Sequence, residues 1–154
     1  MRESQVIGPV LKWVGGKRQL LREILPRVET IPYTRYVEPF FGGGAVFFSL
    51  LPEKAVINDY NGDLINVYRV IKDDVEALIS CLAQHAEQNS KEYYYEVRSW
   101  DRAESYHRLS AVERAARFLY LNKTCYNGLF RVNSKGQFNV PFGRYKHPNI
   151  VNAE

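Results

Sequence analysis

The stretch from residue 38 to 48, EPFFGGGAVFF, constrains the fold most, because three consecutive glycines separate an extended segment from an apolar run. Upstream, YTRYVEPF (33–40) is typical of a strand, and downstream AVFFSLL (45–51) suits a short helix that ends before Pro52. KAVIND (54–59) then predicts a buried strand ending in polar residues. Strand, glycine turn, helix and strand form half of a βαβ arrangement, so this part of the sequence predicts an α/β fold.

The segments on either side of this unit are helical in pattern. Residues 15–28 (GGKRQLLREILPRV) predict a helix that stops near Pro26. Beyond residue 61, apolar side chains recur at threes and fours as far as Leu82, which predicts amphipathic helices interrupted near Asp73-Asp74. Residues 91–100 (KEYYYEVRSW) are a further helix candidate.

The last predicted helix begins with a capping box, Ser110 and Glu113, and Gly128 is a plausible end for it. After it, LFRVN (129–133) and QFNVPF (137–142) alternate polar and apolar residues on either side of Ser134-Lys135-Gly136. This pattern predicts a β-hairpin about a glycine turn. Three side chains of its first arm would then share one face: Leu129, Arg131 and Asn133.

The charge distribution favours a polyanionic partner. The net charge of +4 is a weak signal by itself, but no acidic residue occurs between Glu113 and Glu154. Seven basic residues fall in that interval: Arg114, Arg117, Lys123, Arg131, Lys135, Arg144 and Lys146. We therefore expect this segment, whose charged residues are all basic, to form a phosphate-facing surface.

Cysteine content and hydropathy indicate the compartment. Cys81 and Cys125 lie far apart without a metal-ligand pattern, so we expect two buried or half-buried thiols, no metal site and a reducing environment. No stretch approaches 18 apolar residues, and the N-terminus lacks an uninterrupted apolar region. These features predict a soluble cytoplasmic protein without a membrane partner.

The glycine loop has two interpretations, a tight turn or a loop that lets a ligand approach the backbone. Asp59 favours the second, because a carboxylate at the end of the next strand can accept both hydroxyl hydrogens of a ribose. The dinucleotide fingerprint is incomplete, since Phe47 stands where its third glycine belongs. A P-loop is excluded, since GGKR (15–18) lacks its first glycine and its Ser or Thr. A ligand with a ribose and no phosphate remains.

S-adenosyl-L-methionine is such a ligand, and here the chain resembles a known family. LKWVGGKRQL, VEPFFGGGAVF, NDYNGDLINVY and FLYLNKTCYNGLFRVNSKGQFNVPFGRYKHP occur in this order over residues 10–148. Together they resemble the Dam-type (D12 class) DNA adenine methyltransferases. The resemblance implies a Rossmann-like methyltransferase fold, incomplete here, with an inserted helical target-recognition domain bearing a β-hairpin. The implied ranges are 1–61 for the start of the catalytic domain, 62–150 for target recognition, and 151–154 for the return to the catalytic domain.

The resemblance implies S-adenosyl-L-methionine as cofactor and double-stranded DNA as partner. The implied cofactor contacts are Trp13, Lys17, Glu38, Pro39, Phe40, Gly42, Gly44 and Asp59. Phe47 and Phe48 are better explained as core residues. The implied DNA contacts are Lys12, Tyr126, Asn127, Leu129, Arg131, Asn133, Pro141, Arg144, Tyr145 and Lys146.

Among the DNA contacts, the family assigns different tasks to different positions. Arg131 would read a guanine, and Leu129 and Pro141 would touch a thymine methyl. Tyr126 and Asn127 would stand at the place of an extruded adenine. The last three, Arg144, Tyr145 and Lys146, would contact phosphates. The expected recognition site is GATC.

One motif of the family has no counterpart in this sequence. Amino-group methyltransferases need Asp/Asn-Pro-Pro-Tyr/Phe/Trp, and the sequence contains no Pro-Pro dipeptide. NVPF (139–142) has valine for the first proline and lies in the predicted hairpin, so we do not expect it to substitute. We therefore expect the N-terminal portion of a methyltransferase, whose other part could be a separate chain. The alternatives are an inactive DNA-binding remnant and, on the glycine loop and Asp59 alone, a nicotinamide-dependent enzyme.

Overall fold

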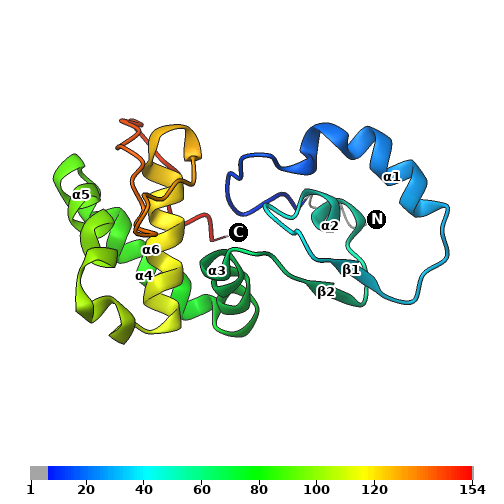
Figure 1. Cartoon of the computed structure of the whole chain (residues 1–154), viewed down its shortest axis with the longest axis horizontal. Helices are drawn as coiled ribbons and strands as arrows, with labels where there is room; N and C mark the ends of the chain where they lie inside the picture. The colour runs from blue at the N-terminus through cyan, green and yellow to red at the C-terminus, as the bar shows by residue number, and fades with distance from the viewer. Residues whose placement is uncertain (1–6, 154) are drawn as a thin grey trace. The chain divides into compact units, whose positions relative to one another are not determined.

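The computed structural model describes residues 7–153, so the first six residues of the predicted domain 1–61 and the last residue of the segment 151–154 lie outside it. The chain divides into two compact units, residues 1–60 and residues 61–154, which we call unit 1 and unit 2 (Figure 1). The described part is dominated by helices and contains one small parallel sheet. This architecture is compatible with a methyltransferase fold. No described helix has both the length and the apolar character to cross a membrane.

Unit 1 contains the strand, turn, helix and strand predicted around the glycines. A 3-10 turn, η1 (Lys17–Leu20), leads into α1 (Leu21–Glu29), and β1 (Tyr36–Glu38), α2 (Ala45–Leu50) and β2 (Ala55–Ile57) follow. The strands β1 and β2 pair in parallel, with Tyr36 opposite Ala55 and Glu38 opposite Ile57. Parallel pairing brings the carboxyl ends of both strands to the same edge of the sheet.

Two details of unit 1 were predicted wrongly. The helix α1 continues through Pro26 to Glu29, because the exposed helix tolerates one missing N–H donor and Arg27 bonds back to both the carbonyl and the carboxylate of Glu23. The strand β2 is largely exposed and not buried. Val37 and Val56 are register partners on one face of the sheet, and they are 59% and 49% exposed.

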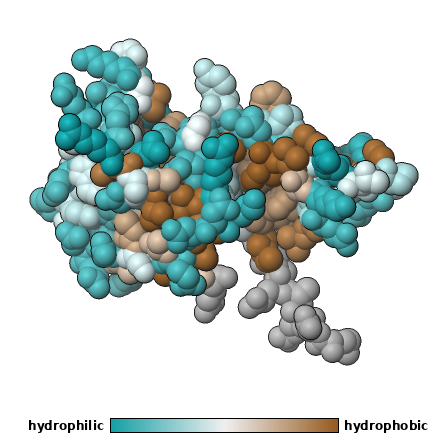
Figure 2. Space-filling model, turned by 90° about the horizontal axis from the view of Figure 1, so that it is seen from below, coloured by the Kyte–Doolittle hydropathy of each residue, from teal (hydrophilic) through white to brown (hydrophobic). Residues whose placement is uncertain are grey.

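The reason for this exposure is where the core of unit 1 lies. The buried apolar side chains in the described part of unit 1 are Leu11, Phe41 in the glycine loop, and Ala45 and Val46 in α2, so none of them belongs to β1 or β2. Apolar surface therefore remains visible on the molecule as brown areas among hydrophilic ones (Figure 2).

Unit 2 is a bundle around one helix. Its elements are α3 (Gly62–Asp73), α4 (Val75–Gln88), α5 (Lys91–Ser99), η2 (Trp100–Arg102), η3 (Glu104–Arg108), α6 (Ala111–Thr124) and η4 (Tyr126–Gly128). Nine of the 14 residues of α6 are buried, and α6 packs against α3, α4 and α5 (Figure 1). The core of unit 2 therefore lies along α6.

The helix boundaries in unit 2 follow local signals. Asp74 leaves helical geometry between α3 and α4, as predicted. The capping box is present, since the Ser110 hydroxyl accepts a hydrogen bond from the Glu113 N–H and the Glu113 carboxylate accepts one from the Ser110 N–H. The predicted end at Gly128 is wrong. Helix α6 ends at Thr124, because Cys125 is extended, and Gly128 ends the short turn η4 instead.

The hairpin forms as a chain reversal without continuous strands. Gly136 has a φ of +75°, and the Asn133 side-chain oxygen accepts hydrogen bonds from the N–H groups of Lys135 and Gln137. Among the described residues, the β-pairing between the two arms is limited to the isolated antiparallel bridge of Val132 with Phe138. The predicted pair of strands is thus reduced to a turn. Backbone groups of Phe138 and Val140 in the second arm form hydrogen bonds with side chains of α5 and η2 instead.

Candidate functional site

The glycine loop of unit 1 lies at the carboxyl ends of β1 and β2. The Asn58 N–H donates to the Glu38 carbonyl and the Phe41 N–H to the Asn58 carbonyl, both at 2.9 Å, so the pairing continues beyond the strands. The Gly42 N–H then donates to Asp59 Oδ2 at 2.8 Å. The loop and the carboxylate that the sequence singled out are thus held together at the edge where open α/β sheets bind ligands.

Lys17 and Glu38, both predicted cofactor contacts, are paired with each other. Lys17 Nζ lies 3.0 Å from Glu38 Oε1, and it also donates to the Phe40 carbonyl. The other oxygen of Glu38 accepts a hydrogen bond from the Tyr36 hydroxyl at 2.7 Å. Burial and the neighbouring Glu38 carboxylate raise the pKa of Tyr36, which therefore stays a hydroxyl donor. Glu38, only 6% exposed, anchors the Lys17 ammonium beside the loop.

The glycines have a packing role that the sequence did not predict. Gly42 has a φ of +56°, and a Cβ there would lie 2.9 Å from Cδ1 of Trp13. Gly44 has a φ of +73°, and a Cβ there would lie 2.5 Å from Cζ of Phe41 and 2.8 Å from Cε2 of Phe48. All three distances are shorter than real Cβ contacts, so the loop needs glycines at these two positions to accommodate the aromatic rings.

The aromatic residues of this segment divide into two groups. Phe47 and Phe48 are half-buried and pack on the buried Phe41, with ring centroids 5.6 and 6.2 Å away. Phe40 is 73% exposed, and only its carbonyl is held, by Lys17. Pro39 is exposed as well.

The groups of unit 1 fit S-adenosyl-L-methionine in kind. Its carboxylate needs a cation, its sulfonium an aromatic face and its ribose a carboxylate, and the segment offers Lys17, Trp13 and Asp59. Among the described residues there is no cluster of His, Cys, Asp or Glu that would suit a metal ion.

The turn of unit 2 presents Arg131 at the surface in a held orientation. Arg131 Nε donates to Asn139 Oδ1 at 2.7 Å, and Nη2 donates to the Asn139 carbonyl at 3.2 Å. These bonds use one edge of the guanidinium. The edge formed by Nη1 and Nη2 keeps donors with the spacing for two parallel hydrogen bonds.

The other predicted DNA contacts are distributed over the same part of the chain. Six of them are exposed: Tyr126, Asn127, Pro141, Arg144, Tyr145 and Lys146. Leu129 is half-buried, and Lys12, in unit 1, is exposed. The amide of Asn133 is used inside the turn, where it accepts from two main-chain N–H groups and donates to Gln137 Oε1. Asn133 therefore shapes the turn that carries Arg131.

Arg117 does not belong to the predicted phosphate-facing surface, so the prediction was wrong for this residue. Its side chain is buried, and Nη2 lies 2.9 Å from Asp101 Oδ2. Arg117 Nε donates to the Val97 carbonyl at 2.9 Å, and the guanidinium carbon lies 5.1 Å from the Tyr106 ring centroid. This cation belongs to the core of unit 2. The exposed basic residues of the segment are Arg131, Lys135, Arg144 and Lys146.

Sequence reasoning missed the side chains that hold the second arm of the turn. Asp101 Oδ2 accepts from the Phe138 N–H at 2.8 Å, and Arg102 Nη2 donates to the Phe138 carbonyl at 2.7 Å. The Tyr94 hydroxyl and Arg98 Nη1 both donate to the Val140 carbonyl. The sequence signal was an acidic residue, Asp101, placed between Arg98 and Arg102.

Both units of the chain resemble known proteins. A family model described as D12 class N6 adenine-specific DNA methyltransferase matches residues 13–154. A Type II methyltransferase of Lactococcus lactis subsp. cremoris is 54% identical over 149 residues, covering 95% of this chain and 51% of the relative. A Type II methyltransferase of Methanocaldococcus jannaschii is 45% identical over 163 residues, with 96% and 56% covered. The DNA adenine methylase of Escherichia coli (strain K12) is 40% identical over 149 residues, with 94% and 50% covered. The chain thus spans about half the length of these relatives.

Proposed function

Because the chain belongs to the D12 class N6 adenine-specific DNA methyltransferase family, we propose that it supplies the cofactor-binding and DNA-reading parts of a DNA adenine methyltransferase. The reaction transfers a methyl group from S-adenosyl-L-methionine to the exocyclic amine of an adenine, expected in GATC. The observation that carries this proposal is the extent of the family match, residues 13–154, which includes the glycine loop and the turn with Arg131.

The proposed cofactor contacts lie in unit 1. When bound, S-adenosyl-L-methionine supplies the methyl group as part of its sulfonium. Asp59 accepts hydrogen bonds from the ribose hydroxyls, and the Gly42 N–H holds its carboxylate in place. Lys17 pairs with the carboxylate of the cofactor while Glu38 keeps the ammonium beside the loop. Trp13 offers its indole face to the sulfonium. The remaining assigned contacts are Pro39, Phe40 and Gly44.

The proposed DNA contacts lie mainly around the turn of unit 2. Arg131, oriented by Asn139, donates two hydrogen bonds to a guanine in the major groove. Leu129 and Pro141 contact a thymine methyl, and Tyr126 and Asn127 take the place of the extruded adenine. Arg144, Tyr145 and Lys146 position the duplex through phosphate contacts. Lys12 also reaches the DNA, and Asn133 shapes the turn that presents Arg131.

The experiment that tests this proposal is transfer of labelled methyl from S-adenosyl-L-methionine to a GATC duplex by the purified 154-residue chain. Binding to the same duplex and to one of scrambled sequence is measured alongside. Incorporation into the GATC duplex supports the full proposal. Selective binding without incorporation supports a DNA-reading piece that is inactive or that works with a second chain. Equal binding to both duplexes together with no incorporation overturns the assignment of specificity.

A further inference from the structure

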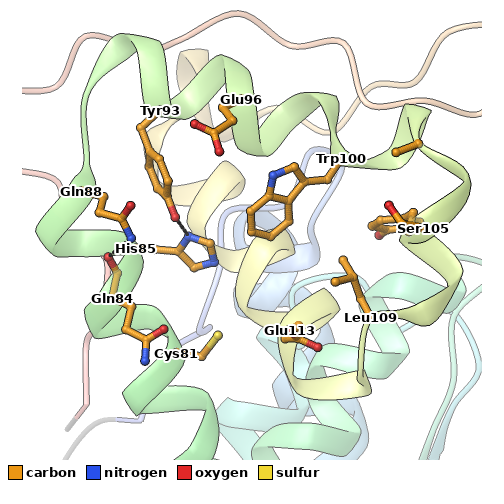
Figure 3. A pocket seen from close by; sticks show the side chains of 12 residues that line it. Cys81, Gln84, His85, Gln88, Tyr93, Glu96, Trp100, Ser105, Leu109 and Glu113 are labelled. Atoms are coloured by element: carbon orange, nitrogen blue, oxygen red, sulfur yellow. Dashed lines mark hydrogen bonds between the residues drawn. The ribbon is translucent and has the colours of Figure 1, made fainter.

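Unit 2 contains a cavity that the methyltransferase assignment does not use. Its volume is about 460 Å³, which falls in the range of small-molecule sites. Side chains from α4, α5, η2, η3 and α6 line it, and the close-up shows them around one hollow (Figure 3). The lining includes three aromatic rings, Tyr93, Trp100 and Tyr106, and two carboxylates, Glu96 and Glu113.

A buried imidazole turns an unused nitrogen toward this cavity. His85 is only 4% exposed, and its Nδ1 lies 2.8 Å from the Tyr93 hydroxyl. Within residues 7–153, no protein group hydrogen-bonds to its second ring nitrogen, Nε2. Figure 3 shows that nitrogen on the cavity side of the ring. A polar atom on so deeply buried a side chain is normally satisfied, so a ligand or solvent must serve it here.

The charged side chains that line the cavity are carboxylates, although the chain as a whole carries a net charge of +4. None of the described residues that line it is a lysine or an arginine. Burial lowers the pKa of His85 to about 4 and raises those of Cys81 and Tyr93, so these groups are uncharged at neutral pH. A hydrogen bond from Ser110 lowers the pKa of Glu113, which stays anionic. The guanidinium carbon of Arg117, which does not line the cavity, lies 5.1 Å from the ring centroid of Tyr106.

We propose that this cavity binds an organic di- or polyammonium compound of alkylamine type. One ammonium donates to His85 Nε2, for which the imidazole carries its proton on Nδ1 and shares it with the Tyr93 hydroxyl. The alkyl chain lies against the Trp100 indole, whose face also attracts a cation. A second ammonium pairs with Glu96 at the wall of the cavity, where Glu113 adds a further negative charge. This binding is independent of the proposed methyl transfer.

The test titrates the 154-residue chain, without DNA and at about 0.15 M salt, with 1,4-diaminobutane and spermidine. Calorimetry gives affinity, and NMR follows the His85 imidazole. We expect saturable binding and a shift of the His85 resonances. The neutral isostere 1,4-butanediol should bind at least tenfold more weakly. Equal binding of diol and diamine, or saturation without a change at His85, overturns the proposal.

Two matched variants test whether the diamine binds to a carboxylate of the cavity. Glu96→Gln keeps the shape of the side chain and should weaken diamine binding roughly three- to tenfold. Glu92→Gln changes an exposed carboxylate of the same helix that does not line the cavity, and should leave binding unchanged. Equal losses in both variants would mean general attraction to acidic side chains and would overturn the site. Since both positions are exposed, neither variant is expected to disturb folding.

Discussion

Asp101 and Arg117 form an ion pair inside unit 2, with an oxygen-to-nitrogen distance of 2.9 Å and side chains that are 11% and 6% exposed. The same carboxylate oxygen of Asp101 accepts the Phe138 N–H at the second arm of the turn. One carboxylate therefore joins the central helix α6 to the arm that faces Arg131 across the turn.

Replacing Asp101 should destabilise unit 2. Asp101→Ala leaves the buried Arg117 guanidinium without its counter-ion, so we expect a loss of about 3–5 kcal/mol in the free energy of unfolding. Glu104→Ala, at an exposed position in the neighbouring η3, is the control and should change it by less than about 0.5 kcal/mol. Urea unfolding measures both. Similar values for the two variants would show that the ion pair does not stabilise the unit.

The glycine loop should not tolerate a side chain at Gly44. Gly44→Ala combines a left-handed backbone with a clash against Phe41, and we expect a loss of about 2–4 kcal/mol in the stability of unit 1. Gly62→Ala is the contrasting variant, because a Cβ there meets nothing within 4 Å at the start of α3. It should be neutral or stabilising by up to about 1 kcal/mol. Thermal unfolding distinguishes the two.

Arg131 should determine sequence preference. Arg131→Ala should weaken binding to the GATC duplex by roughly 1–3 kcal/mol and relax discrimination at a guanine. Lys135→Ala, an exposed cation at the tip of the same turn, should lower affinity without changing the preference. Competition binding with single-base variants of the duplex gives the comparison. Equal losses on cognate and scrambled DNA for Arg131→Ala would contradict the guanine contact.

Lys146 should act on affinity alone. Lys146→Ala should weaken cognate and scrambled duplexes alike and reduce the slope of log affinity against log salt by about one unit. Affinities at four or more salt concentrations, with the wild-type chain in parallel, give the slope. An unchanged slope would refute a phosphate contact at this position.

The stability of unit 2 should fall as the pH drops from about 6.5 towards 4. Burial lowers the pKa of His85 to about 4, so below 6.5 the unfolded chain takes up a proton that the folded chain does not. The His85 contribution is complete above 6.5, and up to about 3 kcal/mol is lost on acidification. His85→Gln should flatten the difference in unfolding free energy between pH 7 and pH 5. His107→Gln, at an exposed histidine, should leave that difference intact.

Local sequence signals predicted several elements correctly. The capping box of Ser110 and Glu113, the break at Asp74 and the turn around Gly136 all appear where expected. Each depends on hydrogen bonds or backbone angles within about four residues, which a short window of sequence specifies. The glycine loop and Asp59 are 17 residues apart, and their prediction came from the order of a strand, a turn, a helix and a second strand.

Two of the wrong predictions, the exposed cation at Arg117 and the pair of continuous strands, concern partners that are distant in the sequence. Arg117 counts as one more cation in a basic segment, but it is neutralised by Asp101, 16 residues away, in the core of unit 2. The second arm of the turn lacks a continuous ladder because Val140 bonds to Arg98, at a separation of 42 residues. Which charges are buried and which backbone groups find side-chain partners depends on how the helices pack, and residue order within a short window carries no information about that packing.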